Sequence, residues 1–245
     1  MFETLLFVVA VAAGGVAAVT GFGIGSLLMP VLALVLETRV AVAAVSIPHF
    51  IGTGFRLWRL GVRPDRRVIW SFGLTSAAGG LAGALLQEWA ANPALSIVFG
   101  ALLAFTSASE WIGWSQRMQF SGAKAWVAGA LSGMLGGLVG NQGGIRSAAL
   151  LGFDMDRRTF VATATTIGLA VDAARMPLYF WQHGHELRGV VSWMAVATAG
   201  VIVGTVVGNR ALGRIPERYF RRIVAIVLAV LGLWMIVRGL LGEGG

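Results

Sequence analysis

The sequence predicts an all-α polytopic membrane protein that contains two inverted repeats, and its glycine-rich breaks are the first evidence. GFGIGS at 21–26 and GNQGGIRS at 140–147 each interrupt a long apolar segment, and they begin 119 positions apart. The same offset continues beyond the breaks and relates Ala43 to Ala162, Ser46 to Thr165 and Arg56 to Arg175. Repeats with glycine-interrupted apolar segments in matching positions are typical of secondary transporters and point to their binding sites.

The composition is the second observation. The chain is 57% hydrophobic and only 12% charged, with 35 glycines, whereas soluble domains carry roughly 25% charged residues. Two halves, 1–116 and 117–245, are expected to share one bundle, because either half alone would leave a glycine-lined face unpacked. The net charge is +8. We interpret it as basic residues at the ends of membrane segments, which mark the cytoplasmic side. Because the positive charge is explained in this way, we expect no nucleic-acid partner.

Eight apolar segments follow one another along the chain. They are Thr4 to Leu36, Val40 to Leu57, Val68 to Leu86, Ala94 to Trp114, Ala125 to Phe153, Thr159 to Trp181, Gly189 to Val207 and Tyr219 to Val237. Six have the length of one span, for which a helix needs about 20 residues. The first and fifth, at 33 and 29 residues, are too long for one crossing and too short for two. Each is therefore predicted to be a broken re-entrant hairpin with two arms of about 14 residues, or about 21 Å.

The distribution of basic residues distinguishes two possible topologies, one in which every apolar segment crosses the membrane and one with two re-entrant hairpins. If all eight segments cross the membrane, sixteen basic residues outside the spans divide eight against eight. If the two broken segments are hairpins, thirteen lie on one side and only Arg39, Arg188 and Arg238 on the other, as the positive-inside rule requires. This arrangement predicts six full spans and both termini outside. It also predicts inverted halves, because each half then crosses an odd number of times.

The breaks are the first candidate substrate-binding elements. A helix that begins inside the bilayer directs free N–H groups and its positive dipole end at the break, which makes an anion site. The second arms are expected to begin near Ile24 and Gly143. The alternative is that the glycines allow close helix packing and that the amides satisfy the broken backbone. The candidate residues are Gly21, Gly23, Gly25, Asn141, Gln142, Gly143 and Gly144.

Five charged or titratable residues within the spans complete the candidate set. Arg146 follows the second break, where a cation is unfavourable unless an anion lies beside it; the alternative is a buried salt bridge to Asp172 or Glu110. Arg56 either binds substrate or extends to water. Arg175 lies one turn after Asp172, which favours an ion pair over proton coupling. His49 is either a hydrogen-bonded packing residue or a proton carrier.

Nothing in the sequence favours an enzyme or a metalloprotein. His183 and His185 lie with Glu186 in a predicted polar loop, QHGHE, and the chain has no cysteine, so this cluster is weak evidence for a metal site. No Ser/His/Asp spacing, HExxH motif or phosphate loop is present. We therefore expect no catalytic residue, no metal and no cofactor.

The sequence resembles the TauE/SafE family of sulfite exporters along its whole length. The resemblance rests on GFGIGSLLMP, on its second copy GNQGGIRSAALLGFDMDRRTFVATAT, and on the repeated four-segment pattern. It implies transport of sulfite, an organosulfonate or a related sulfur-containing carboxylate, driven by the membrane potential or a proton gradient. The second copy departs from the family pattern, with Asn141 and Gln142 where glycine is usual. Arg146 makes a doubly charged or larger anion plausible.

The sequence thus predicts a transporter that exports a small anion by alternating access, in a bacterial-type cytoplasmic (inner) membrane. The anion is expected at the glycine-rich breaks. The expected partners are the anion, the lipid bilayer and a second copy of the chain in a homodimer. An anion channel is the closest alternative, and an integral-membrane enzyme is less favoured.

Overall fold

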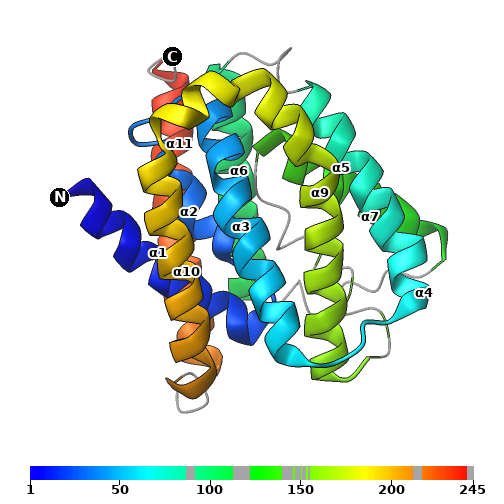
Figure 1. Cartoon of the computed structure of the whole chain (residues 1–245). Helices are drawn as coiled ribbons and strands as arrows, with labels where there is room; N and C mark the ends of the chain where they lie inside the picture. The colour runs from blue at the N-terminus through cyan, green and yellow to red at the C-terminus, as the bar shows by residue number, and fades with distance from the viewer. Residues whose placement is uncertain are drawn as a thin grey trace.

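Helices form every regular element in the described part of the chain, and the computed structural model describes residues 1–86, 92–112, 122–139, 146, 150, 153, 155–211 and 217–241. Figure 1 shows them as one bundle. The helices are α1 (Phe2–Thr20), α2 (Ile24–Leu32), α3 (Thr38–Leu60), α4 (Arg66–Val68), the π-helical turn η1 (Ile69–Gly73), α5 (Leu74–Leu86), α6 (Asn92–Ile112), α7 (Ala123–Val139), α9 (Arg157–Gly189), α10 (Val191–Ala211) and α11 (Glu217–Leu240).

The first glycine-rich break lies between α1 and α2, where the sequence predicts it. Gly21 ends α1 in the left-handed region at φ 82°, and its N–H donates to the Ala17 carbonyl at 2.9 Å. Gly23 has φ 122°, a value that residues with a Cβ rarely adopt. The prediction that the second arm begins at Ile24 is confirmed.

The two arms are unequal, so the expectation of about 14 residues in each is wrong. α1 has 19 residues and α2 has 9. The prediction divides the apolar segment evenly up to Leu36, but α2 ends at Leu32 and residues 33–36 form turns and a bend. These four residues are apolar, so hydropathy does not mark the end of the helix.

Three helices of the described chain have the length and hydropathy to cross a membrane: Thr38–Leu60, Arg66–Leu86 and Val191–Gly208. Two shorter apolar helices, Phe2–Ala18 and Ser96–Ser109, accompany them. The outer surface also carries large exposed apolar side chains, among them Trp58, Trp70, Val127, Trp181, Val230 and Leu233. Extensive exposed apolar surface on a helical bundle fits contact with lipid. The molecule is a multi-pass membrane protein.

The polar QHGHE segment is helical, and the predicted loop is therefore wrong. α9 continues from Arg157 to Gly189, with one non-helical residue, His183, at φ −119° and ψ 18°. The loss of hydropathy after Trp181 marks the end of the apolar zone. It does not end the helix, because a helix that leaves the apolar zone satisfies its own backbone hydrogen bonds.

Glycines allow very close contact where α1 packs along α10. A Cβ at Gly204 would lie 2.0 Å from the Val11 carbonyl oxygen, and one at Gly14 would lie 2.2 Å from the Val201 carbonyl oxygen. Both distances are too short for any other residue. The backbones therefore meet here directly, as small residues allow in membrane bundles.

α5 also packs along α7 through close contacts at glycines. A Cβ at Gly133 would lie 1.9 Å from the Ser76 carbonyl oxygen, and one at Gly83 would lie 2.1 Å from the Met134 carbonyl oxygen. Gly133 follows Gly14 by 119 positions and Gly204 follows Gly83 by 121. Glycines at matching positions of the two halves therefore allow close backbone contact at both crossings.

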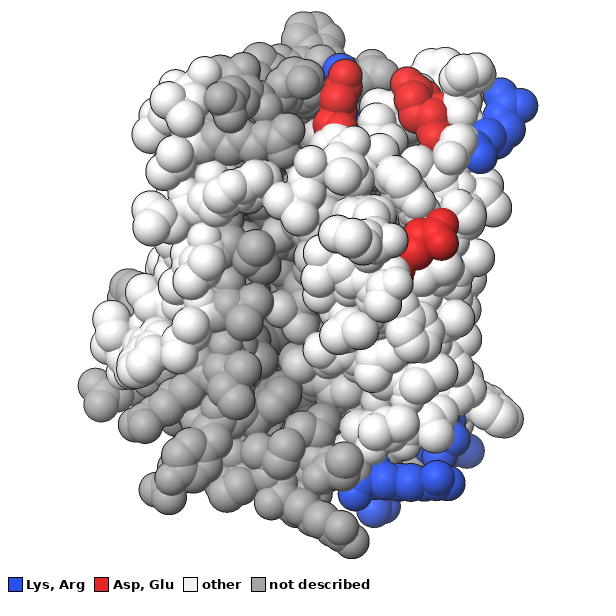
Figure 2. Space-filling view, turned by 90° about the vertical axis from the view of Figure 1, so that its left-hand side faces the viewer, with Lys and Arg blue, Asp and Glu red and all other residues white. Residues whose placement is uncertain are grey.

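α3 and α9 pack against each other and run in opposite directions through the middle of the bundle in Figure 1. The end of α3 and the start of α9 lie at the lower end of that view, and the start of α3 and the end of α9 lie at the upper end. Figure 2 shows only Lys and Arg side chains among the charged residues at the lower end of the visible face, whereas Asp and Glu side chains lie toward the upper end together with other Lys and Arg side chains. Charge is therefore unevenly divided between the two ends of the bundle.

Candidate functional site

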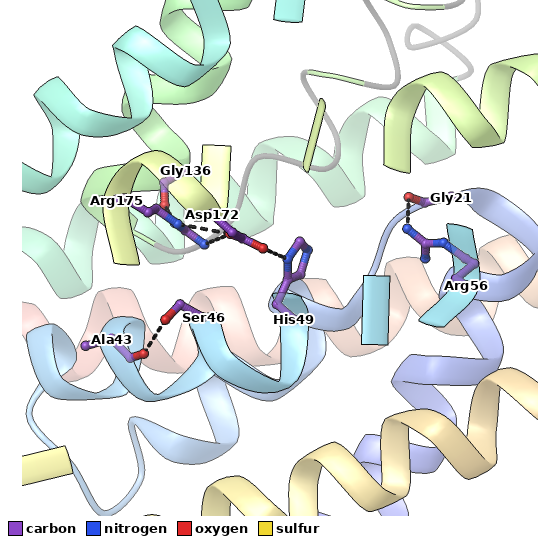
Figure 3. A network of polar contacts seen from close by, with 8 residues as sticks. All are labelled: Gly21, Ala43, Ser46, His49, Arg56, Gly136, Asp172 and Arg175. Atoms are coloured by element: carbon purple, nitrogen blue, oxygen red, sulfur yellow. Dashed lines mark hydrogen bonds and ion pairs between the residues drawn. The ribbon is translucent and has the colours of Figure 1, made fainter. Parts of the chain in front are cut away.

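The buried polar groups of α3 and α9 meet at Asp172. Nδ1 of His49, on α3, lies 2.5 Å from Oδ2 of Asp172 on α9. The other carboxylate oxygen accepts hydrogen bonds from Nη2 and Nε of Arg175 at 2.8 and 3.1 Å. Figure 3 shows the His49 ring pointing to the carboxylate from one side and the Arg175 guanidinium approaching it from the other. The three side chains form one buried unit.

Arg56 is also buried, and it bridges three elements. Its Nη1 and Nη2 donate to the carbonyls of Ala17 and Gly21 at 2.9 and 3.1 Å, and its Nε donates to Thr165 Oγ1 at 3.1 Å. The bond to Gly21 is drawn in Figure 3. The alternative that Arg56 extends to water at the membrane surface is wrong, because its side chain is only 3% exposed. Its charge lies instead at the C-terminal end of α1, where a helix carries negative partial charge.

Arg175 makes the corresponding contact with α7. Its Nη1 donates to the Gly136 carbonyl, and its guanidinium lies 5.6 Å from the centre of the Tyr179 ring. The Tyr179 hydroxyl donates to the Gly137 carbonyl. Arg175 and Tyr179 thus join the central helix α9 to the last turns of α7.

Arg146 has a different environment. It is 1% exposed, and its Nε and Nη1 have no hydrogen-bond partner among the described residues. Its guanidinium lies over Gly168, where a Cβ would be 3.1 Å from Nη1. The carboxylate of Asp172 pairs with His49 and Arg175. The alternative of a salt bridge from Arg146 to Asp172 is therefore not what the described residues show.

These groups leave an excess of positive charge in the interior. Arg146 interacts electrostatically with Arg56, Asp172 and Arg175. Three guanidinium groups therefore accompany one carboxylate, and of the three only Arg175 bonds to it. An unpaired charge is very unfavourable in a membrane interior, so the arrangement is suited to binding an anion beside Arg146.

The structure brings several of the predicted site residues together. Gly21 meets Arg56, while His49, Asp172 and Arg175 form one hydrogen-bonded unit. Gly23 forms the turn before α2, and Gly25 is buried in the first turn of that helix. The second break and its candidates Asn141, Gln142, Gly143 and Gly144 lie outside the described residues. In the part of the chain that is described, no group of three or more His, Cys, Asp or Glu is placed to hold a metal.

Sequence reasoning missed four residues that complete this region: Thr53, Thr165, Gly168 and Tyr179. The repeat offset contained a signal for two of them. At 119 positions, Thr53 corresponds to Asp172 and His49 corresponds to Gly168. A comparison of the two halves at each polar position would have identified both.

Fold and site together define a multi-pass helical membrane protein with a buried, positively charged centre. The family model described as "Sulfite exporter TauE/SafE" matches residues 6–235, and the chain belongs to this family of membrane transporters. The resemblance found in the sequence is thereby confirmed. No curated protein and no solved structure matched the chain.

Proposed function

We propose that the protein is a secondary transporter that exports a small anion by alternating access, with sulfite, an organosulfonate or a related sulfur-containing carboxylate as its substrate. The single observation that carries the proposal is the buried Arg146 guanidinium, two of whose nitrogens have no hydrogen-bond partner in the described chain. Its charge adds to those of Arg56 and Arg175. An anion next to Arg146 offsets this charge and uses the free donors.

Helix packing supports two inverted repeats, 1–116 and 117–245, within one bundle. α1 packs along α10 of the other half, and α7, the counterpart of α1, packs along α5, the counterpart of α10. The central helices α3 and α9 come one from each half and run in opposite directions. The charged groups therefore lie between two packed groups of helices, α1, α3 and α10 on one side and α5, α7 and α9 on the other. Each group contains helices of both repeats, and rocking of one group against the other exposes a site alternately to the two sides.

The surface arginines support the proposed orientation in a bacterial-type inner membrane, with both termini outside. Exposed arginines gather at the ends of α3 and α10 and at the starts of α4 and α9: Arg59, Arg63, Arg66, Arg67, Arg158 and Arg210. At the opposite end lie the exposed Arg188 and the half-buried Arg39. The positive-inside rule assigns the first group to the cytoplasm.

Sulfite flux into sealed proteoliposomes tests the proposed function. A carrier gives saturable uptake and exchanges labelled for unlabelled sulfite, whereas an anion channel gives flux that does not require exchange. Flux no greater than that of protein-free vesicles, for sulfite and organosulfonates alike, contradicts transport of these anions.

The contribution of Arg146 is tested by Arg146→Gln, which keeps length and polarity but removes the charge. A hydrogen bond to a charged group contributes roughly 1.5 to 3 kcal/mol, so we expect sulfite binding to weaken about tenfold to a hundredfold. The control is Arg188→Gln, at an exposed arginine, which is expected to bind as the wild type does. Unchanged affinity in a folded Arg146→Gln protein excludes Arg146 from the site.

A further inference from the structure

The register of α3 against α9 places Thr53 opposite Gly168. Two observed contacts define this register: His49 with Asp172, and Arg56 with Thr165. Thr53 lies four residues after His49 and three before Arg56, and Gly168 lies four before Asp172 and three after Thr165. Residues three and four apart share one face of a helix. In this antiparallel pair, positions 53 and 168 therefore face each other between the two contacts.

The Thr53 side chain is buried without a partner. The residue is 1% exposed, and its Oγ1 has no hydrogen-bond partner among the described residues. Buried threonines within helices commonly donate to the carbonyl four positions earlier, as Thr205 does to Val201. Because a buried hydroxyl without a partner is unfavourable, Thr53 is suited to a ligand at this position.

Gly168 provides the space that Arg146 occupies. A Cβ at position 168 would lie 3.1 Å from Nη1 and 3.6 Å from Cζ of Arg146, which is tighter than ordinary carbon contacts. Glycine thus lets the guanidinium approach the α9 backbone. The unpaired nitrogens of Arg146 and the unpaired hydroxyl of Thr53 consequently lie at the same crossing of α3 and α9.

We propose that Thr53, Gly168 and Arg146 form a binding site, here called the seat, for the head group of one oxyanion. The Thr53 hydroxyl donates to one oxygen, and the Arg146 guanidinium donates to another. Gly168, which has no side chain, lets the guanidinium lie close to the α9 backbone. This inference rests on the proposed function and adds the residues that set specificity. It favours anions with several oxygens on one centre, such as sulfite and sulfonates, because the two donors come from different segments and need separate acceptors.

The repeat explains why there is one seat in the described chain and not two. The positions equivalent to Thr53 and Gly168 are Asp172 and His49, and these two side chains bond to each other. The equivalent place at the same α3–α9 crossing is therefore closed by a hydrogen-bonded pair of side chains. Thr53 and Gly168 form no such pair, which leaves room for a ligand.

Thr53→Val removes the hydroxyl at nearly constant size and is the first test. Loss of one hydrogen bond to a charged ligand predicts sulfite binding to the purified protein about tenfold to a hundredfold weaker. Thr53→Ser retains the hydroxyl and is expected to bind within about threefold of the wild type, allowing for its extra rotamer freedom. The matched control is Thr198→Val on α10, a half-buried threonine that bonds its own helix, for which no change is expected.

Thr53→Asp gives a second test, in which the unfolding temperature is measured with and without sulfite. A carboxylate at position 53 pairs with Arg146 in place of the anion, as Asp172 pairs with Arg175. We therefore expect a higher unfolding temperature than the wild type in sulfite-free buffer, and no further rise when sulfite is added. Gly168→Ala is expected to weaken sulfite binding, because the new Cβ displaces the guanidinium.

The outcomes separate this inference from the proposed function. If the wild type binds none of sulfite, methanesulfonate and a sulfur-containing carboxylate, both proposals are wrong. If the wild type binds sulfite and Arg146→Gln does not, while Thr53→Val and Gly168→Ala bind as the wild type does, only the seat is wrong. A Thr53→Asp protein that still gains stability from sulfite also overturns it.

Discussion

Arg56 and Arg175 donate hydrogen bonds to carbonyl groups that are separated by the same 119 positions as the arginines themselves. Nη1 of Arg56 bonds the Ala17 carbonyl of α1, and Nη1 of Arg175 bonds the Gly136 carbonyl of α7. Each arginine thus joins a central helix to the last turns of the first helix in its own half. The positive charge is favourable there, because a helix carries negative partial charge at its C-terminal end.

Arg56→Lys should lower stability, because one ammonium group cannot replace three guanidinium contacts. Lysine loses the geometry that reaches Ala17, Gly21 and Thr165 together, and the loss of one or two bonds to a charged group predicts about 2 to 4 kcal/mol. Thermal unfolding in detergent measures the effect. Arg59→Lys is the control, since Arg59 is exposed and lies over the Phe55 ring at 5.9 Å. Equal unfolding temperatures for the wild type and Arg56→Lys contradict this role.

Arg175→Ala should fold less well than the double variant Asp172→Asn with Arg175→Gln. The single change leaves a buried carboxylate without its guanidinium partner, whereas the double change removes both charges of the pair. The free energies of unfolding of Asp172→Asn, Arg175→Gln and the double variant, each compared with the wild type, give the coupling energy. Simple additivity of the two single changes means that the pair does not act as a unit. A stable double variant that transports normally shows that the pair is only structural.

Gly133→Ala and Gly204→Ala should each disrupt the bundle. The added methyl groups would lie 1.9 Å from the Ser76 carbonyl oxygen and 2.0 Å from the Val11 carbonyl oxygen. Backbone cannot move as a side chain does, so we expect a loss of about 1 to 3 kcal/mol or more. The monodisperse fraction after purification and the unfolding temperature measure the loss. Gly184→Ala is the control, because a Cβ there meets nothing within 4 Å; a similar loss in all three variants contradicts a crossing-specific effect.

Single cysteines should report the proposed topology directly, since the natural chain contains none. In intact cells, Arg188→Cys should react with a membrane-impermeant maleimide. Arg63→Cys should react only after lysis, because the positive-inside rule places it in the cytoplasm. Both side chains are exposed. The reverse pattern shows that the orientation is opposite, and labelling of both in intact cells shows that the two positions are not on opposite sides.

Asp156 should stabilise the start of α9 only above acidic pH. Its Oδ2 accepts a hydrogen bond from the Thr159 hydroxyl, and Oδ1 accepts from the N–H groups of Arg158 and Thr159. These bonds hold the pKa of Asp156 below its ordinary value of 3.8. Because the folded pKa is lowered, the stabilisation is present above the ordinary value and is lost as the pH falls through the folded pKa. Asp156→Ala should therefore be less stable than the wild type at pH 7, and the difference should shrink toward pH 3. A difference that does not change with pH excludes the carboxylate as its cause.

Local features of the sequence predicted the helices and the position of the first break. Apolar runs marked the segments because lipid requires them. Gly21 and Gly23 marked the break because their positive φ values favour glycine. The predicted helix ends were wrong where the apolar run and the helix end at different residues. α2 ends at Leu32, before its apolar run does, and α9 continues past Trp181, where its apolar run ends.

Only the tertiary structure decided which side chains contact each other across the bundle. The sequence by itself determined the repeat, the membrane class and the one-turn spacing of Asp172 and Arg175, since each is a matter of composition or local order. It did not place His49 against Asp172, 123 positions away, or Arg146 over Gly168. Those contacts depend on how each helix is rotated about its axis and where it crosses its neighbours, and the glycine crossings that set both act between segments far apart in the chain.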